Sequence, residues 1–205
     1  PNDFRDASGS PGTRYWQQRV DYVIRTTLDT TTHSVKGSER ITYHNNSPQP
    51  LGYLWFQLDQ NIEAKTSRAN MTKSALPATL SPQARRFLLP EEEPVGGYDI
   101  TRVALVSVNG QTAKPARYIV NGTQMRVNLD TPLPKGGKAV VDIDWSFVVP
   151  EGGNNSRGVR EQVKDGWIYE VAQWFPRAAV YDDVTGWQND PFLGQGEFYL
   201  NFGNY

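Results

Sequence analysis

The residues with the greatest chemical capacity gather near the end of the chain, between Glu170 and Phe198. The carboxylates Asp182, Asp183, Asp190 and Glu197 could flank a sugar as acid and base, or bind calcium through oxygen ligands. Adjacent aspartates on a strand point to opposite faces, and aspartates in loops commonly accept backbone N–H groups. The sequence therefore favours structural roles for these carboxylates, with catalysis or metal binding as the alternative.

The chain is poor in the other residues that enzymes use. It has two histidines, His33 and His44, and no cysteine. The histidines do not have the spacing of a zinc motif, and His44, beside the turn "NNSP", is expected to be solvated. No serine lies in G-x-S-x-G, and the "GGK" at 136–138 leads into a strand rather than a helix, which excludes a P-loop. We therefore expect no catalytic residue and no metal ligand in this chain.

Composition sets further limits on the class of protein. The 205 residues carry 21 Lys+Arg and 22 Asp+Glu, a net charge of -1, which does not favour nucleic acid as a partner. No run approaches the roughly 18 apolar residues of a membrane span. A start at Pro1 and a strand-like pattern up to the last residues lead us to expect a piece of a larger protein. The compartment stays open, with the periplasm or the exterior favoured over the cytoplasm.

Alternating apolar and polar residues predict the elements that position these groups. The clearest runs are "WQQRVDYVIRTTL", "SERITYHN" with Ile41 and Tyr43 inward, "LGYLWFQL", "ITRVALVSV", "ARYIV", "TQMRVNL", "VVDIDWSFVV", "DGWIYEVAQWF" and "GEFYLNF". Asn109-Gly110 and Asn121-Gly122 predict hairpin turns, because Asn-Gly suits the positive φ of a type I′ turn. Within residues 59–98, "SPQARRFLL" from Ser81 predicts one short helix.

These elements predict an all-β fold, either an antiparallel sandwich or a saddle-shaped curved sheet, with at most one short helix. Residues 1–14 are polar and rich in Gly, Ser and Pro, which predicts a disordered lead or linker. Residues 15–205 are expected to form a single β-domain, truncated at its C-terminus.

At "VAQWFPRAAVYDDVTGW" followed by "PFLGQGEFYLNFG", the chain resembles the N-terminal β-domain of zinc-dependent M1-family aminopeptidases, which are gluzincin metallopeptidases. The strands "YVIRTTLDTTTHSVKGSERITYHNNSP" and "LGYLWFQL" resemble the opening of that domain. The resemblance covers about residues 15–205 and is specific in "AQWFPRAAVYDD".

The resemblance implies a saddle-shaped sheet that packs on the catalytic domain of the same parent chain and closes one side of the peptide cleft. The family's zinc motif H-E-x-x-H and its catalytic tyrosine lie further along the chain, so zinc is expected in the parent and no cofactor in this chain. The implied substrate is a peptide N-terminus. Gln173 matches the first residue of a Gln-x-Glu segment that helps to hold the substrate's α-amine, whereas the second position is Phe175, which cannot accept a hydrogen bond.

Other hypotheses remain open. Arg177 and Asp182 are expected to be structural and to pair with each other. Trp174, Phe175 and Trp187 are expected to hold the wall of the cleft together. A free-standing β-sandwich that stacks exposed tryptophans on glycans is the main alternative, and a glycosidase using Glu197 and an aspartate is the third.

Overall fold

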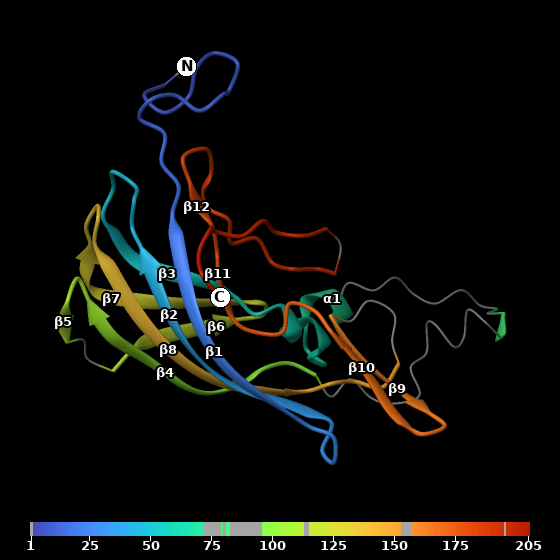
Figure 1. The fold of residues 1–205 in the computed structure, drawn as a ribbon. Coiled ribbons are helices and arrows are strands. Elements are labelled where there is room, and N and C mark those ends of the chain that lie inside the picture. Colours follow the sequence, from blue (N-terminus) through green and yellow to red (C-terminus); the bar gives the residue numbers. More distant parts are fainter. Residues whose placement is uncertain are drawn as a thin grey trace.

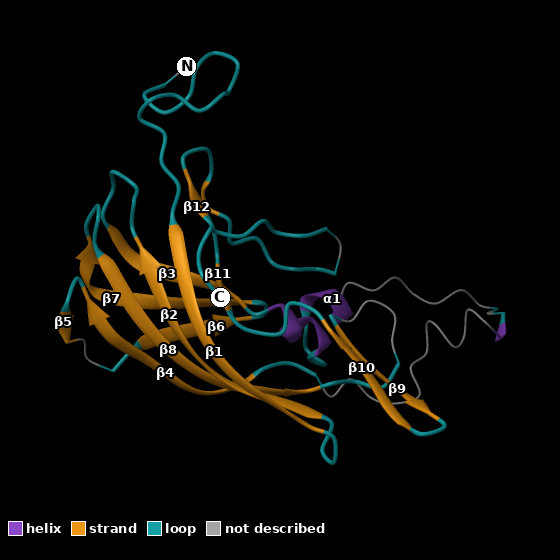
Figure 2. Ribbon diagram, in the orientation of Figure 1, coloured by secondary structure: helices purple, strands orange, loops and turns teal. Residues whose placement is uncertain are grey.

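The computed structural model describes residues 2–71, 79, 81–82, 96–112, 115–152, 157–194 and 196–205. Strands dominate this part of the chain and all the paired strands are antiparallel, so the all-β antiparallel prediction is confirmed (Figures 1 and 2). The strands are β1 (Arg19–Asp29), β2 (Ser34–His44), β3 (Leu51–Gln57), β4 (Asp99–Val108), β5 (Gln111–Thr112), β6 (Arg117–Asn121), β7 (Gln124–Leu133), β8 (Lys138–Val148), β9 (Gly158–Val163), β10 (Gly166–Val171), β11 (Arg177–Ala178), β12 (Tyr181–Asp182) and β13 (Gly186–Trp187).

The largest sheet has the strand order β1-β2-β8-β4-β5. Its long strands alternate, so that one face is buried and the other carries ion pairs such as Arg40 with Asp142 at 2.7 Å. The second sheet has the order β11-β3-β7-β6. Inward residues of both sheets form one hydrophobic core, in which Ile41, Phe56 and Val141 are completely buried. Burying such side chains stabilises the fold by roughly 1.5–3 kcal/mol each.

One position on β2 shows how closely the core of the largest sheet is packed. Gly37 lies opposite Trp145, and a Cβ at Gly37 would lie 2.3 Å from the indole ring. The ring can therefore occupy this position over Gly37 only because Gly37 has no side chain. Two residues further along β2, Glu39 points into the same buried face, where its side chain is 3% exposed. Neither of its carboxyl oxygens has a hydrogen-bond partner in the described part of the chain.

The first predicted hairpin is confirmed and the second is shifted by one residue. Val108 pairs with Gln111, and the two residues between them, Asn109 and Gly110, have φ of 49° and 81°. This is the positive-φ pair that Asn-Gly favours. In the second hairpin, however, Asn121 pairs with Gln124 and remains in the strand, so the turn consists of Gly122 and Thr123. Gly122 alone supplies the positive φ, at 57°.

The excursion after β3 contains the helical turns. A 3-10 helix, η1, spans Asp59–Glu63, and a short α-helix, α1, spans Arg68–Met71. The helix predicted from Ser81 falls mostly outside the described residues. No described helix is long and apolar enough to cross a membrane.

The last predicted strand, "GEFYLNF", was wrong as a sheet strand. Within the described residues it forms only an isolated parallel bridge between Phe202 and Arg19. The segment nevertheless runs beside β1, because the N–H groups of Val20 and Tyr22 donate to the carbonyls of Phe202 and Asn204 at 2.9 and 2.8 Å. The hairpin of β9 and β10 was predicted only in its second half, and β10 ends at Val171 rather than continuing to Phe175.

The segment before β1 makes specific contacts with the end of the chain. Arg5 donates two hydrogen bonds to Asp183, at 2.6 and 2.9 Å, and the Asp183 side chain is 1% exposed. Phe4 contacts Trp16, which in turn stacks on Tyr181 with ring centroids 5.7 Å apart. The assignment of residues 1–14 to a linker and of residues 15–205 to one domain remains a prediction.

Candidate functional site

Gln173 lies two residues after the end of β10, where the chain turns away from the hairpin. Its φ is 49°, a left-handed conformation that costs a residue with a side chain roughly 1–2 kcal/mol. Its carbonyl accepts a hydrogen bond from the Tyr98 hydroxyl at 3.3 Å, and the Nε2 of Gln60 lies 3.5 Å away. Its side-chain Oε1 is buried and accepts no hydrogen bond from the described residues. Gln173 thus combines a strained backbone with an unpaired acceptor.

Gln60, in η1, holds the backbone just before Gln173. Its Nε2 donates to the carbonyls of Ala172 and Arg157 at 2.8 and 3.1 Å. The same amide therefore ties the residue before Gln173 to the start of the β9 hairpin. Gln60 is only 1% exposed, and a buried amide that bonds several carbonyls restricts all of them. Sequence analysis did not identify Gln60, because its role depends on segments about 100 residues away in the sequence.

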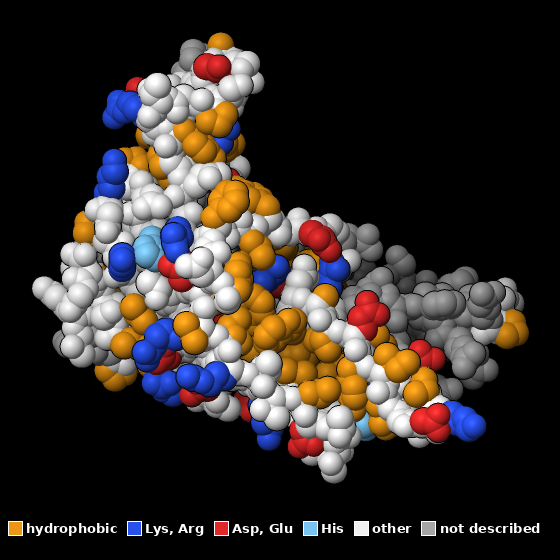
Figure 3. Space-filling view, in the orientation of Figure 1, with side chains coloured by type: hydrophobic (Ala, Val, Ile, Leu, Met, Phe, Trp, Pro, Cys, Tyr) orange, Lys and Arg blue, Asp and Glu red, His pale blue; other side chains and the backbone are white. Residues whose placement is uncertain are grey.

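A row of aromatic rings continues from Gln173 across the face of the large sheet. Trp174 lies 5.9 Å from Trp145 and 5.0 Å from Phe175, measured between ring centroids. Phe175 then contacts Tyr22 at 5.5 Å, and Tyr22 stacks on Tyr205 at 5.0 Å. Figure 3 shows apolar side chains gathered on this side of the molecule, and Tyr205 at the end of the row is 66% exposed. Trp187 belongs to a different group of rings, with Tyr43, Tyr53 and Tyr181.

Arg177 pairs with Asp59, so the expected pair with Asp182 was wrong. The guanidinium donates to Asp59 Oδ2 at 2.5 and 3.2 Å, and the two side chains are 6% and 1% exposed. Burial raises the pKa of Asp59, while the charge of Arg177 opposes that rise. The pair lies close to Tyr98, whose pKa burial raises well above its usual value. Arg177 was paired wrongly because Asp59 is 118 residues away in the sequence.

Three carboxylates of the 170–198 region, Asp182, Asp183 and Glu197, have separate partners rather than a shared site. Burial opposes the ionisation of Asp182, but hydrogen bonds from Tyr199, Thr185, Val184 and Gln188 outweigh it and lower its pKa. Asp183 is bound to Arg5, as described above. Glu197 lies 3.3 Å from Arg157. Among the described residues no three His, Cys, Asp or Glu side chains lie together in a way that could hold a metal ion.

Both histidines form hydrogen bonds. His33 Nδ1 lies 2.6 Å from the Tyr169 hydroxyl. His44 Nε2 lies 2.8 Å from Asp21 Oδ2, and its side chain is 18% exposed, so the expectation of a solvated histidine was wrong. Asp21 also accepts from Arg19, and this hydrogen bond is the main reason why the pKa of Asp21 falls to about 2. The two histidines therefore hold strands in place rather than form a site together.

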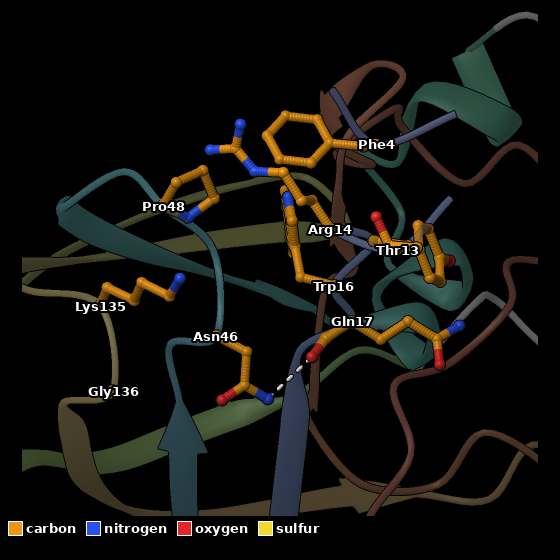
Figure 4. A pocket seen from close by; sticks show the side chains of 10 residues that line it. Phe4, Thr13, Arg14, Trp16, Gln17, Asn46, Pro48, Lys135 and Gly136 are labelled. Atoms are coloured by element: carbon orange, nitrogen blue, oxygen red, sulfur yellow. Dashed lines mark hydrogen bonds between the residues drawn. The ribbon is translucent and has the colours of Figure 1, made fainter. Parts of the chain in front are cut away.

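A pocket of about 530 Å³ lies apart from Gln173, between the N-terminal segment and the turns that follow β2 and β7 (Figure 4). The residues that line it are Phe4, Thr13, Arg14, Tyr15, Trp16, Gln17, Asn46, Pro48, Lys135 and Gly136. The Asn46 amide donates to the Gln17 carbonyl at 2.7 Å and joins the two sides. Sequence analysis missed this pocket, since its lining comes from three separate segments.

Comparison with known proteins gave matches only among solved structures. No family model matches the chain, and no curated protein matches its sequence. The M1 zinc metallopeptidase from Deinococcus radiodurans is similar at 13% identity and a TM-score of 0.37, covering 83% of this chain and 26% of the other. A mutant of that enzyme bound to a Tyr-Ser-Ala substrate gives 13% identity, a TM-score of 0.36, and coverages of 65% and 20%. The chain thus spans about a quarter or less of these structures, and a likeness at this level does not assign it to a family.

Proposed function

We propose that this chain is a non-catalytic β-domain that packs on the catalytic domain of an M1-like zinc aminopeptidase and forms one wall of its peptide cleft. Gln173 contacts the substrate's free α-amine. The sequence resemblance at "AQWFPRAAVYDD" supports this function, and the geometry of Gln173 is the observation that carries it. Zinc would be held by the parent's catalytic domain, and this chain supplies no ligand to it.

Gln173 is suited to an amine in two respects. Its Oε1 accepts no hydrogen bond from the described residues, whereas buried polar atoms are nearly always paired. An ammonium group carries three donors and no acceptor, so it is a chemically matched partner. The φ of 49° sets the course of the backbone at the turn after β10, where the Gln173 amide lies.

The aromatic row beside Gln173 supports the proposed packing on a catalytic domain. Trp174 and Phe175 are half-buried and packed against the core, and Tyr205 extends the row to an exposed end. A partly exposed aromatic surface next to Gln173 provides the apolar contact that a neighbouring domain needs. The glycan-binding alternative depended on exposed tryptophans, but all six are buried or half-buried, so no observation favours it.

The first test is the gene that encodes the chain. We expect an H-E-x-x-H segment within about 100 to 200 residues after this domain, roughly one domain length. We also expect the purified chain of 205 residues to hydrolyse no aminoacyl substrate. Metal-dependent hydrolysis by this chain alone would overturn the proposal.

The second test measures the role of Gln173 in the full-length enzyme. Gln173→Ala should raise KM for aminoacyl substrates about tenfold, because a hydrogen bond to a charged group contributes roughly 1.5–3 kcal/mol. Gln173→Glu should restore or improve KM, since a carboxylate also accepts from an ammonium. Gln162→Ala is the matched control, because Gln162 is exposed on β9. An unchanged KM in Gln173→Ala would exclude the proposed contact.

A further inference from the structure

The pocket beside the N-terminal segment has the size of a binding site. Its volume of about 530 Å³ lies within the range of small-molecule sites. The N-terminal wall is anchored by the two hydrogen bonds from Arg5 to Asp183, which is almost completely buried. Arg5 itself is partly exposed, at 26%, so the pair joins the N-terminal wall to the body of the domain at its surface. Gln173 does not line this pocket, so a ligand bound here is independent of the function proposed for Gln173.

The charge of the lining differs from that of the whole chain. Arg14 and Lys135 are its charged residues and no carboxylate belongs to it, although the chain as a whole has a net charge of -1. Arg14 pairs with Asp3 outside the lining at 2.9 Å, but both side chains are 68% exposed, and such a pair is weak. Lys135 forms no ion pair with a described residue. In Figure 4 the Arg14 side chain extends across the pocket toward Pro48.

The remaining wall is aromatic. Phe4 and Trp16 meet edge to face, with ring centroids 6.3 Å apart, and Tyr15 lies beside them in the lining. The indole Nε1–H of Trp16 is buried and finds no acceptor among the described residues. The pocket therefore offers flat apolar surface together with two cations.

We propose that this pocket binds a small organic anion with an aromatic body. The ring packs on Phe4 and Trp16, and the anionic group is bound by Arg14 and Lys135. Carboxylate and phosphate share this chemistry, because the guanidinium fork binds either one through two hydrogen bonds. Asp3 competes with the ligand for Arg14.

Isothermal titration at low ionic strength tests this proposal with 3-phenylpropionate, phenyl phosphate and the neutral 3-phenylpropanamide. We expect saturable binding of at least one anion, weaker binding of the amide, and loss of affinity as salt is added. The anion that binds more tightly identifies the charged group. Arg14→Gln and Lys135→Gln should each weaken binding about tenfold, since each removes a charge-assisted contact.

Asp3→Asn is the most specific variant. It removes the carboxylate that competes with the ligand for Arg14, so binding should become a few-fold tighter. The matched controls are Arg117→Gln and Asp130→Asn, an exposed ion pair at 3.0 Å on β6 and β7 that lies outside the pocket. Both controls should leave binding unchanged. Absence of saturable binding to wild type, equal binding of the amide, or affinities that neither Arg14→Gln nor Lys135→Gln alters would overturn the proposal. Circular dichroism of each variant shows whether it is folded. If one of the two variants Arg14→Gln and Lys135→Gln fails to fold, the other still tests the proposal.

Discussion

Glu39 and Asp59 are both carboxylic acids buried in the same core, but they differ in their surroundings. Asp59 forms an ion pair with Arg177 at 2.5 Å, whereas Glu39 has no hydrogen-bond partner among the described residues. Burial raises the pKa of both groups, and it raises that of Glu39 well above its usual value with nothing to oppose it. One acid is therefore accommodated by pairing and the other by retaining its proton. An unpaired buried acid therefore makes the stability of the fold depend on pH, whereas a paired acid makes that stability depend on the residue that pairs with it.

The largest effect should come from removing the partner. Arg177→Met leaves Asp59 buried without its ion-pair partner, and breaking a buried pair in this way costs roughly 3–5 kcal/mol. We expect the free energy of unfolding in urea to fall by about that amount. Arg117→Met is the control, because the Arg117 side chain is 74% exposed and exposed pairs contribute at most about 1 kcal/mol. A loss below about 1 kcal/mol in Arg177→Met would show that the buried pair does not need its cation.

The next effect depends on pH. In the folded state Glu39 keeps its proton above the pH at which the unfolded chain loses it, so the unfolded state binds fewer protons and stability falls as pH rises. Stability should therefore decline from about pH 4.5 up to the folded pKa of Glu39, by up to about 1.4 kcal/mol per pH unit. Glu39→Gln removes this contribution and leaves that of Asp59.

Urea unfolding of wild type and Glu39→Gln between pH 4 and pH 8 measures the difference. As pH rises from about 4.5, the free energy of unfolding of the variant should increase relative to that of wild type. Below this pH the two free energies should differ by a constant amount. Parallel curves over the whole range would mean that Glu39 titrates alike in the folded and unfolded chain.

The smallest effect concerns a neutral acceptor. Gln173→Gly removes the unpaired Oε1 and also the side chain that strains a φ of 49°. Relief of left-handed strain should offset the extra flexibility of glycine in the unfolded chain, so thermal unfolding should show a gain of up to about 1 kcal/mol. A clear loss would show that the Gln173 side chain supports the fold rather than a ligand.

The sequence predicts much of the strand framework, because a half-buried strand must alternate. The runs around Ile41 and Val141 became β2 and β8, and Asn109-Gly110 formed the expected turn. The same alternation that points Ile41 and Tyr43 inward also puts Glu39 on the buried face, so the signal for the unpaired acid was present.

Other features depend on contacts that a pattern along the chain does not contain. The pairing of Arg177 with Asp59 requires the distance between η1 and β11 in the fold, and residues 196–202 alternate like a strand although they bond only part of the β1 edge. The φ of Gln173 is equally invisible, because glutamine has no preference for the left-handed region. Contacts between distant segments, rather than the local sequence pattern, determine these features.

The contact of the last residues with β1 has a consequence for how the molecule behaves in a crowded solution. β1 is the outer strand of the largest sheet, and Phe202 and Asn204 occupy two of its N–H groups. The approach is so close that a Cβ on Gly203 would lie 1.6 Å from the Val20 carbonyl oxygen, so only glycine fits there. An open outer strand recruits other chains. Residues 202–204 therefore cover the Val20–Tyr22 part of this edge and leave less of it open to pairing with other chains.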